Sequence, residues 1–215
     1  MPLFRASALP NIITIARVLA APVVLILVFV PGFAAQMVAF TVFVVAAVSD
    51  LWDGYLARKH GWISDFGQLV DPIADKLLLV ATFVPFYILS HRDAPVGALP
   101  WIGELPLWIV ILIFAREVLV TVLRSIAANR GLILPAGRAG KQKAVFQNIF
   151  IGSLIFWYAL QSAALERLWS GPWWERWQAF HGGVVMSTLA VAVLLTLQSL
   201  VIYLRSWKDL RGRAA

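Results

Sequence analysis

Residues 12–30 form an apolar segment as long as a membrane-spanning helix, and Arg17 is the only charged residue in it. A helix rises about 1.5 Å per residue, so roughly 20 apolar residues cross the hydrocarbon core of a bilayer. Charged residues make up 13% of the chain, about half of their share in a soluble domain. The sequence therefore predicts an all-α, polytopic integral membrane protein embedded in a lipid bilayer.

Five further apolar segments follow, which gives six predicted transmembrane helices in a single domain, 1–215. The predicted spans are 12–30, 33–56, 65–89, 105–128, 144–164 and 182–204. Pro31 and Gly32 end the first span, and Ser64 with Asp65 is typical of a helix N-cap before the third. Residues 1–10 are predicted to lie at the membrane interface, and the basic tail, 205–215, is predicted to leave the membrane.

Basic residues are distributed unevenly between the two predicted sides of the membrane. Twelve of the 18 Lys and Arg side chains fall on the side where the first span begins, whereas the opposite side receives Arg92, Arg167 and Arg176. The positive-inside rule then places both termini in the cytoplasm. Loops facing anionic lipid explain the net charge of +7, so we expect no nucleic-acid partner. The absence of a targeting peptide indicates the bacterial cytoplasmic (inner) membrane, with an organelle form lacking its presequence left open.

Four aspartates stand out in this apolar chain, because they occur as two pairs near the cytoplasmic ends of neighbouring predicted spans. Asp50 and Asp53 are three residues apart, and Asp71 and Asp75 are four apart. Both spacings put a pair on one face of a helix, one turn above the other. Four carboxylates brought together repel one another, and a hard divalent cation is their natural counter-charge. The pattern predicts metal-assisted chemistry on the cytoplasmic side.

Two alternative roles for the aspartates stay open. Intramembrane acids also occur in cation-coupled transporters, although transport sites lie near the midplane rather than at one face. Structural ion pairs are the second alternative, with Arg17, Arg58, Lys76 or Arg116 as partners. Arg17 itself has two interpretations. It either extends to the membrane edge, or shares with Asn11 and Thr14 a polar stripe that faces a phosphate.

The residues between the aspartates complete a fixed pattern, D-x2-D-G-x2-A-R-x8-G-x3-D-x3-D. Gly54 and Gly67 lack side chains next to the carboxylates, which allows close approach of a helix or a flat ligand. Arg58 has the geometry for bidentate contact with phosphate. At every defined position this pattern resembles the signature of the CDP-alcohol phosphotransferase family, whose members have six transmembrane helices and cytoplasmic termini.

The resemblance implies transfer of a substituted phosphate from a CDP-linked donor to an alcohol, with release of CMP. It implies two Mg²⁺ or Mn²⁺ ions, one held by Asp50, Asp53 and Asp71 and the other by Asp50, Asp71 and Asp75. Asp75 would also be the catalytic base. The residues implied to contact the donor, CDP-diacylglycerol, are Asn11, Thr14, Gly54, Ala57, Arg58, Ser64 and Gly67. The resemblance also leaves a homodimer open.

The acceptor alcohol is predicted from a second set of charged residues. Positive-inside loops account for some of them, but Arg116 and Glu117 lie inside an apolar segment. A phosphorylated acceptor needs such cations. The predicted acceptor-phosphate residues are Arg116, Arg124, Arg138, Lys141 and Lys143. Their surroundings resemble the branch of the family that uses sn-glycerol 3-phosphate; phosphatidylinositol-phosphate and cardiolipin synthases are the alternatives within the family.

Overall fold

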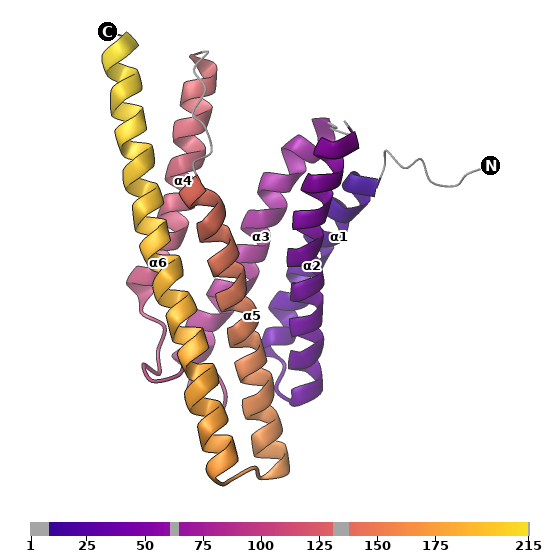
Figure 1. The fold of residues 1–215 in the computed structure, drawn as a ribbon. Helices are drawn as coiled ribbons and strands as arrows, with labels where there is room; N and C mark the ends of the chain where they lie inside the picture. The colour runs from indigo at the N-terminus through magenta and orange to yellow at the C-terminus, as the bar shows by residue number, and fades with distance from the viewer. Residues whose placement is uncertain (1–8, 61–64, 131–137, 215) are drawn as a thin grey trace, which may run out of the picture.

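The computed structural model describes residues 9–60, 65–130 and 138–214, and the side chains of most of them. These residues form six α-helices and no β-strand, in agreement with the all-α prediction. The helices are α1 (Leu9–Phe29), α2 (Phe33–His60), α3 (Asp65–Ser90), α4 (Leu107–Asn129), α5 (Arg138–Arg167) and α6 (Pro172–Ala214). They run alternately in opposite directions, so both ends of the described chain lie at the same end of the bundle (Figure 1).

The helix boundaries follow the sequence signals closely in the first half of the chain. α1 ends at Phe29 and α2 begins at Phe33, around Gly32, whose φ of 108° is accessible to glycine at little cost. α3 begins at Asp65, directly after the predicted N-cap position. The third span, predicted as 65–89, therefore matches α3 to within one residue.

Three predicted boundaries in the second half lie well inside the helix that the structure shows. α5 begins at Arg138 rather than 144, and α6 extends from Pro172 to Ala214 rather than 182–204. Hydropathy marks the part of a helix that fits the bilayer, whereas hydrogen bonding continues into polar residues at each end. With 43 residues, α6 is about 65 Å long, which exceeds the roughly 30 Å hydrocarbon core. The basic tail is therefore a helical extension up to Ala214.

An aromatic core holds α3 against α5. Phe83, Phe86 and Phe150 are fully buried, and the Phe83 and Phe150 ring centroids lie 5.6 Å apart. Tyr158 packs edge-on against Phe86, and its hydroxyl donates a hydrogen bond of 2.7 Å to the Gly97 carbonyl. This bond satisfies the phenol inside the core and fixes the loop between α3 and α4 to the bundle.

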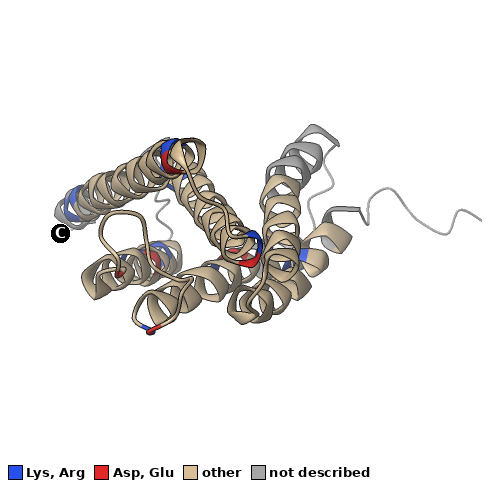
Figure 2. Cartoon of the chain, turned by 90° about the horizontal axis from the view of Figure 1, so that it is seen from below, with Lys and Arg blue, Asp and Glu red and all other residues tan. Residues whose placement is uncertain are grey.

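The outer surface of the bundle is apolar. Leu19, Ile26, Val45 and Leu194 each expose 60% or more of their surface, and Figure 2 shows few charged positions on the ribbon seen from below. Within the described ranges, four helical segments are long and apolar enough to cross a membrane. They are Ile12–Phe29, Ile73–Ser90, Gly140–Arg167 and Pro172–Lys208. Their length and composition give the protein the character of a multi-pass membrane protein.

Candidate functional site

The aspartates of the sequence motif lie on two consecutive helices. Asp50 and Asp53 belong to the last part of α2, and Asp71 and Asp75 to the first part of α3. Only residues 61–64 separate the two helices, so their ends are neighbours in space. The backbone thus brings the two pairs to the end of the bundle where the described termini lie (Figure 1).

Many of the predicted metal, donor and acceptor side chains lie outside the described part of the structure. Ser64 is outside the described residues altogether. For a second group, the structure describes the helical backbone but not the side chain. That group comprises Asn11, Asp50, Asp53, Gly54, Ala57, Arg58, Gly67, Asp71 and Arg138. Asp75 and Thr14 are described in full, and Thr14 is buried in α1.

Asp75 combines an exposed carboxylate with a buried cationic partner. Its side chain is 60% exposed, whereas that of Arg17 is 3% exposed. The Arg17 guanidinium donates a hydrogen bond of 2.9 Å from Nη1 to Asp75 Oδ1. Arg17 therefore lies inside the bundle rather than at the membrane edge. Its charge keeps the Asp75 carboxylate oriented while leaving it accessible from outside.

A cavity of about 130 Å³ begins at this ion pair. Five helices wall it, because α1 contributes Arg17, α4 contributes Glu117, and α2, α3 and α5 supply the rest. Alanines at four wall positions leave the space open. The lining residues are Arg17, Ala46, Ala47, Ala74, Asp75, Lys76, Leu78, Leu79, Glu117, Lys143, Ala144, Gln147, Asn148 and Ile151. We call this space the central cavity.

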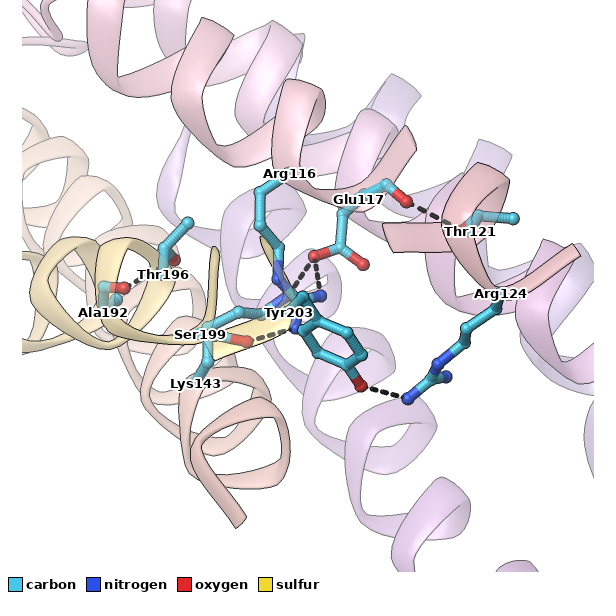
Figure 3. Close-up of polar contacts among 9 residues, drawn as sticks. All are labelled: Arg116, Glu117, Thr121, Arg124, Lys143, Ala192, Thr196, Ser199 and Tyr203. Atoms are coloured by element: carbon cyan, nitrogen blue, oxygen red, sulfur yellow. Dashed lines mark hydrogen bonds and ion pairs between the residues drawn. The ribbon is translucent and has the colours of Figure 1, made fainter. Parts of the chain in front are cut away.

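Glu117 holds two cations together at the α4 side of the central cavity. Its Oε1 accepts a hydrogen bond of 2.8 Å from Arg116 Nη1 and a second one from Lys143 Nζ. Arg116 Nη2 also donates to Ser199 Oγ at 2.6 Å. Figure 3 shows dashed lines from the Glu117 carboxylate to both cationic groups and from Ser199 to the Arg116 guanidinium. The net charge of these three ionised groups is positive, so the cluster favours an anion.

A glycine of α5, Gly140, lies directly against this cluster. A Cβ at Gly140 would lie 3.3 Å from Arg116 Nη2, which is tighter than ordinary van der Waals contact. Gly140 thus leaves room for the Arg116 guanidinium beside α5, one turn from the Lys143 that reaches Glu117. The next arginine along α4, Arg124, donates a hydrogen bond to the Tyr203 hydroxyl and lies over the same ring (Figure 3).

The structure brings together only part of the predicted acceptor set. Lys143 lines the central cavity, and Arg116 is joined to it through Glu117. Arg124 lies against Tyr203, and Lys141 is exposed on α5; neither is among the lining residues. The predicted set does not include Arg17, Glu117 or Gln147, which also line the cavity.

The sequence contains a signal for each of these missed residues. Arg17 belongs to a stripe that can face a phosphate, and Glu117 is half of a charge pair in an apolar segment. Gln147 follows Lys143 by four residues, so the two share one face of α5. Which interior face becomes a cavity depends on how α5 packs against its neighbouring helices, and local spacing does not contain that information.

The carboxylate oxygens of the aspartate motif are suitable ligands for a hard divalent cation. Among the described side chains no three His, Asp or Glu residues gather at one point, and three of the four motif aspartates are outside that set. Asp75 nevertheless presents an exposed carboxylate at the cavity, on the helix that also carries Asp71. Oxygen ligands of this kind are those that Mg²⁺ and Mn²⁺ prefer.

Comparison with known proteins gives a consistent result. The chain matches the CDP-alcohol phosphatidyltransferase family over residues 7–204. It is 36% identical to the "Probable phosphatidylglycerophosphate synthase" of Mycobacterium tuberculosis over 212 residues, which are 97% of this chain and 86% of that protein. A "CDP-diacylglycerol--glycerol-3-phosphate 3-phosphatidyltransferase" of Rickettsia typhi is 35% identical over 147 residues, 68% of this chain and 75% of the relative.

A plant relative extends the similarity beyond bacteria. The "CDP-diacylglycerol--glycerol-3-phosphate 3-phosphatidyltransferase 2" of Arabidopsis thaliana is 30% identical over 211 residues, covering 96% of this chain and 82% of its own length. The family match over residues 7–204 reaches all six helices and includes both aspartate pairs. The chain belongs to the CDP-alcohol phosphatidyltransferase family, as the resemblance of its D-x2-D-G-x2-A-R-x8-G-x3-D-x3-D pattern implied.

Proposed function

We propose that this phosphatidyltransferase moves the phosphatidyl group of CDP-diacylglycerol to sn-glycerol 3-phosphate and releases CMP. The observation that carries the proposal is the central cavity, which joins the motif carboxylate of Asp75 to the cationic cluster of Lys143, Glu117 and Arg116. The Asp75 side of the central cavity is suited to the acceptor hydroxyl, and the Lys143 side is suited to the acceptor phosphate. The names of the relatives at 30–36% identity support the same substrates.

Asp75 is the proposed base. The acceptor hydroxyl is a poor nucleophile at neutral pH, so a carboxylate that takes its proton as the bond to phosphorus forms accelerates attack. The Asp75 carboxylate is exposed enough to meet a substrate, and Arg17 holds one of its oxygens. The bond from phosphorus to the CMP oxygen breaks as the new ester forms, and CMP leaves as the anion.

Two divalent cations, Mg²⁺ or Mn²⁺, would be held by the aspartates as the family resemblance implies. Asp50, Asp53 and Asp71 would hold one, and Asp50, Asp71 and Asp75 the other. When bound, they supply positive charge that neutralises the pyrophosphate of the donor. Asn11, Thr14, Gly54, Ala57, Arg58, Ser64 and Gly67 are the proposed contacts of the CDP group.

Lys143 and Arg116 are the proposed centre of the acceptor-phosphate site. Lys143 lies on the wall of the central cavity, and Glu117 holds its ammonium group beside the Arg116 guanidinium. A dianionic phosphate binds well where two cations converge. Arg124, Arg138 and Lys141 stay predictions for this site.

The proposed arrangement in the membrane has six spans, with both termini and the active site at the cytoplasmic face of the bacterial inner membrane. Its support is the distribution of charge. Described cations at the cavity end include Arg130, Arg205 and Lys208, whereas Arg92 and Arg167 lie toward the other end. The acyl chains of the donor then stay in the bilayer while its nucleotide reaches the aspartates and the soluble acceptor enters from the cytoplasm.

An acceptor screen tests the proposal. Purified protein with Mg²⁺ and CDP-diacylglycerol is expected to release CMP with sn-glycerol 3-phosphate, and little with inositol phosphate or phosphatidylglycerol. CMP release that depends on one of the latter acceptors would instead identify a phosphatidylinositol-phosphate or cardiolipin synthase. Cation-driven uptake into vesicles without CMP release would identify a transporter and refute the proposal.

A further inference from the structure

Gln147 is a buried amide that the described part of the protein leaves without a hydrogen bond at its nitrogen. Its side chain is 3% exposed and lines the central cavity. Its Nε2 is among the buried polar atoms that have no partner among the described residues. Buried amides are nearly always hydrogen-bonded, because a donor removed from water without a replacement is destabilising. An amide retained in such a place is therefore suited to a ligand.

The position of Gln147 relates it to the acceptor. It follows Lys143 by four residues on α5, one turn of about 5.4 Å farther into the bundle and on the same face. Asp75 of α3 and Glu117 of α4 line the same cavity. A three-carbon acceptor with its phosphate at Lys143 and its primary hydroxyl at Asp75 has its middle carbon between the two groups. The amide of Gln147 faces this space.

We propose that the Gln147 amide binds the secondary hydroxyl of the acceptor and so selects a glycerol phosphate over an acceptor that lacks this group. The inference rests on the proposed function and adds a specificity-determining residue to it. A hydroxyl donates one hydrogen bond and accepts others, and a neutral amide offers the complementary donor and acceptor. A phosphate oxygen would be bound better by the neighbouring cations. A site that hydrogen-bonds a hydroxyl discriminates strongly against its absence.

The test compares two acceptors that differ only at this hydroxyl. The kcat/KM of purified full-length protein is measured by CMP release with sn-glycerol 3-phosphate and with 3-hydroxypropyl phosphate, in the presence of Mg²⁺ and CDP-diacylglycerol. Wild type is expected to prefer the first by at least about tenfold. Gln147→Met keeps the length of the side chain and removes both polar atoms, so the preference is expected to fall to about twofold or less. The matched control is Gln142→Met, at an exposed position of the same helix, which is expected to keep the wild-type preference.

The ratio between the acceptors does not depend on how much of a variant is active, so it separates specificity from folding. If Gln147→Met yields no active protein, Gln147→Asn, which withdraws the amide by one methylene, provides the same measurement. An unchanged preference in either variant, or equal losses with both acceptors, would overturn the assignment of Gln147. Wild type that releases no CMP with either phosphate acceptor would overturn the proposed function itself, so the two failures are distinguishable.

Discussion

Replacing Glu117 with glutamine keeps the shape of the side chain but removes the negative charge between Arg116 and Lys143. Arg116 Nη1 and Glu117 Oε1 are 2.8 Å apart, and at an effective dielectric constant of about 20 such a pair attracts by about 6 kcal/mol. Desolvation offsets part of this attraction, and removing one partner of a buried pair typically costs about 3–5 kcal/mol. The Glu117 side chain keeps 20% exposure, so we expect the lower value, about 3 kcal/mol.

The assay is thermal unfolding of the purified protein in one detergent. A loss of about 3 kcal/mol corresponds to a fall in Tm of about 6–12 °C for a chain of this size. Glu175→Gln is the control, because it makes the same chemical change at an exposed position of α6. Lys143→Met should then destabilise the Glu117→Gln variant less than it destabilises wild type, since the pair is already broken. Equal Tm values for Glu117→Gln and Glu175→Gln would show that the Glu117 carboxylate does not stabilise the cluster.

Three further substitutions test the site and the fold. Asp75→Asn is expected to lower kcat by about 10²–10⁴-fold while CDP-diacylglycerol binding persists; normal turnover would exclude Asp75 as the base. Lys143→Met is expected to raise the KM for sn-glycerol 3-phosphate by about 10–100-fold and the KM for the CDP-lipid much less. Lys208→Met, at an exposed position of α6, is the control. Equal rises in the two KM values for Lys143→Met would argue against an acceptor-phosphate site. Gly97→Ala is expected to lower the Tm, because Gly97 has a φ of 146° and a Cβ there would lie 2.6 Å from the Leu89 backbone oxygen. Gly103→Ala is the control, since Gly103 also has a positive φ but a Cβ there would meet nothing within 4 Å, and its Tm should fall less. A larger fall in Tm for Gly103→Ala would exclude the steric contact as the cause.

The sequence predicted what depends on local spacing. The i, i+3 and i, i+4 spacings of Asp50–Asp53 and Asp71–Asp75 fix which face each side chain occupies and so predicted paired carboxylates, while the family followed from the resemblance of the full eight-position pattern to a known signature. The start of α3 at Asp65 followed from a capping signal. The early start of α5 at Arg138 was missed, since polar residues that extend a helix beyond the bilayer leave no hydropathy signal.

The site residues that depend on helix packing were harder to predict. Glu117 of α4 joins Arg116 to Lys143 of α5, and Gly140 of α5 leaves room for the Arg116 guanidinium. Gln147 lines a cavity, rather than packing in a filled core, because alanines at four positions of the wall leave the central cavity open. Both facts depend on contacts between residues far apart in the sequence, which spacing along one helix does not determine.

Mass spectrometry of the lipid product measures the proposed reaction itself. Purified protein is incubated with CDP-diacylglycerol, sn-glycerol 3-phosphate and Mg²⁺, and the lipid and nucleotide products are quantified together. Phosphatidylglycerophosphate and CMP are expected in equal amounts from the wild-type protein, and the Asp75→Asn variant is expected to form both at least about 100-fold more slowly. A wild-type protein that forms no phosphatidylglycerophosphate would contradict the proposed function, and an Asp75→Asn variant that forms it at the wild-type rate would contradict the proposed base.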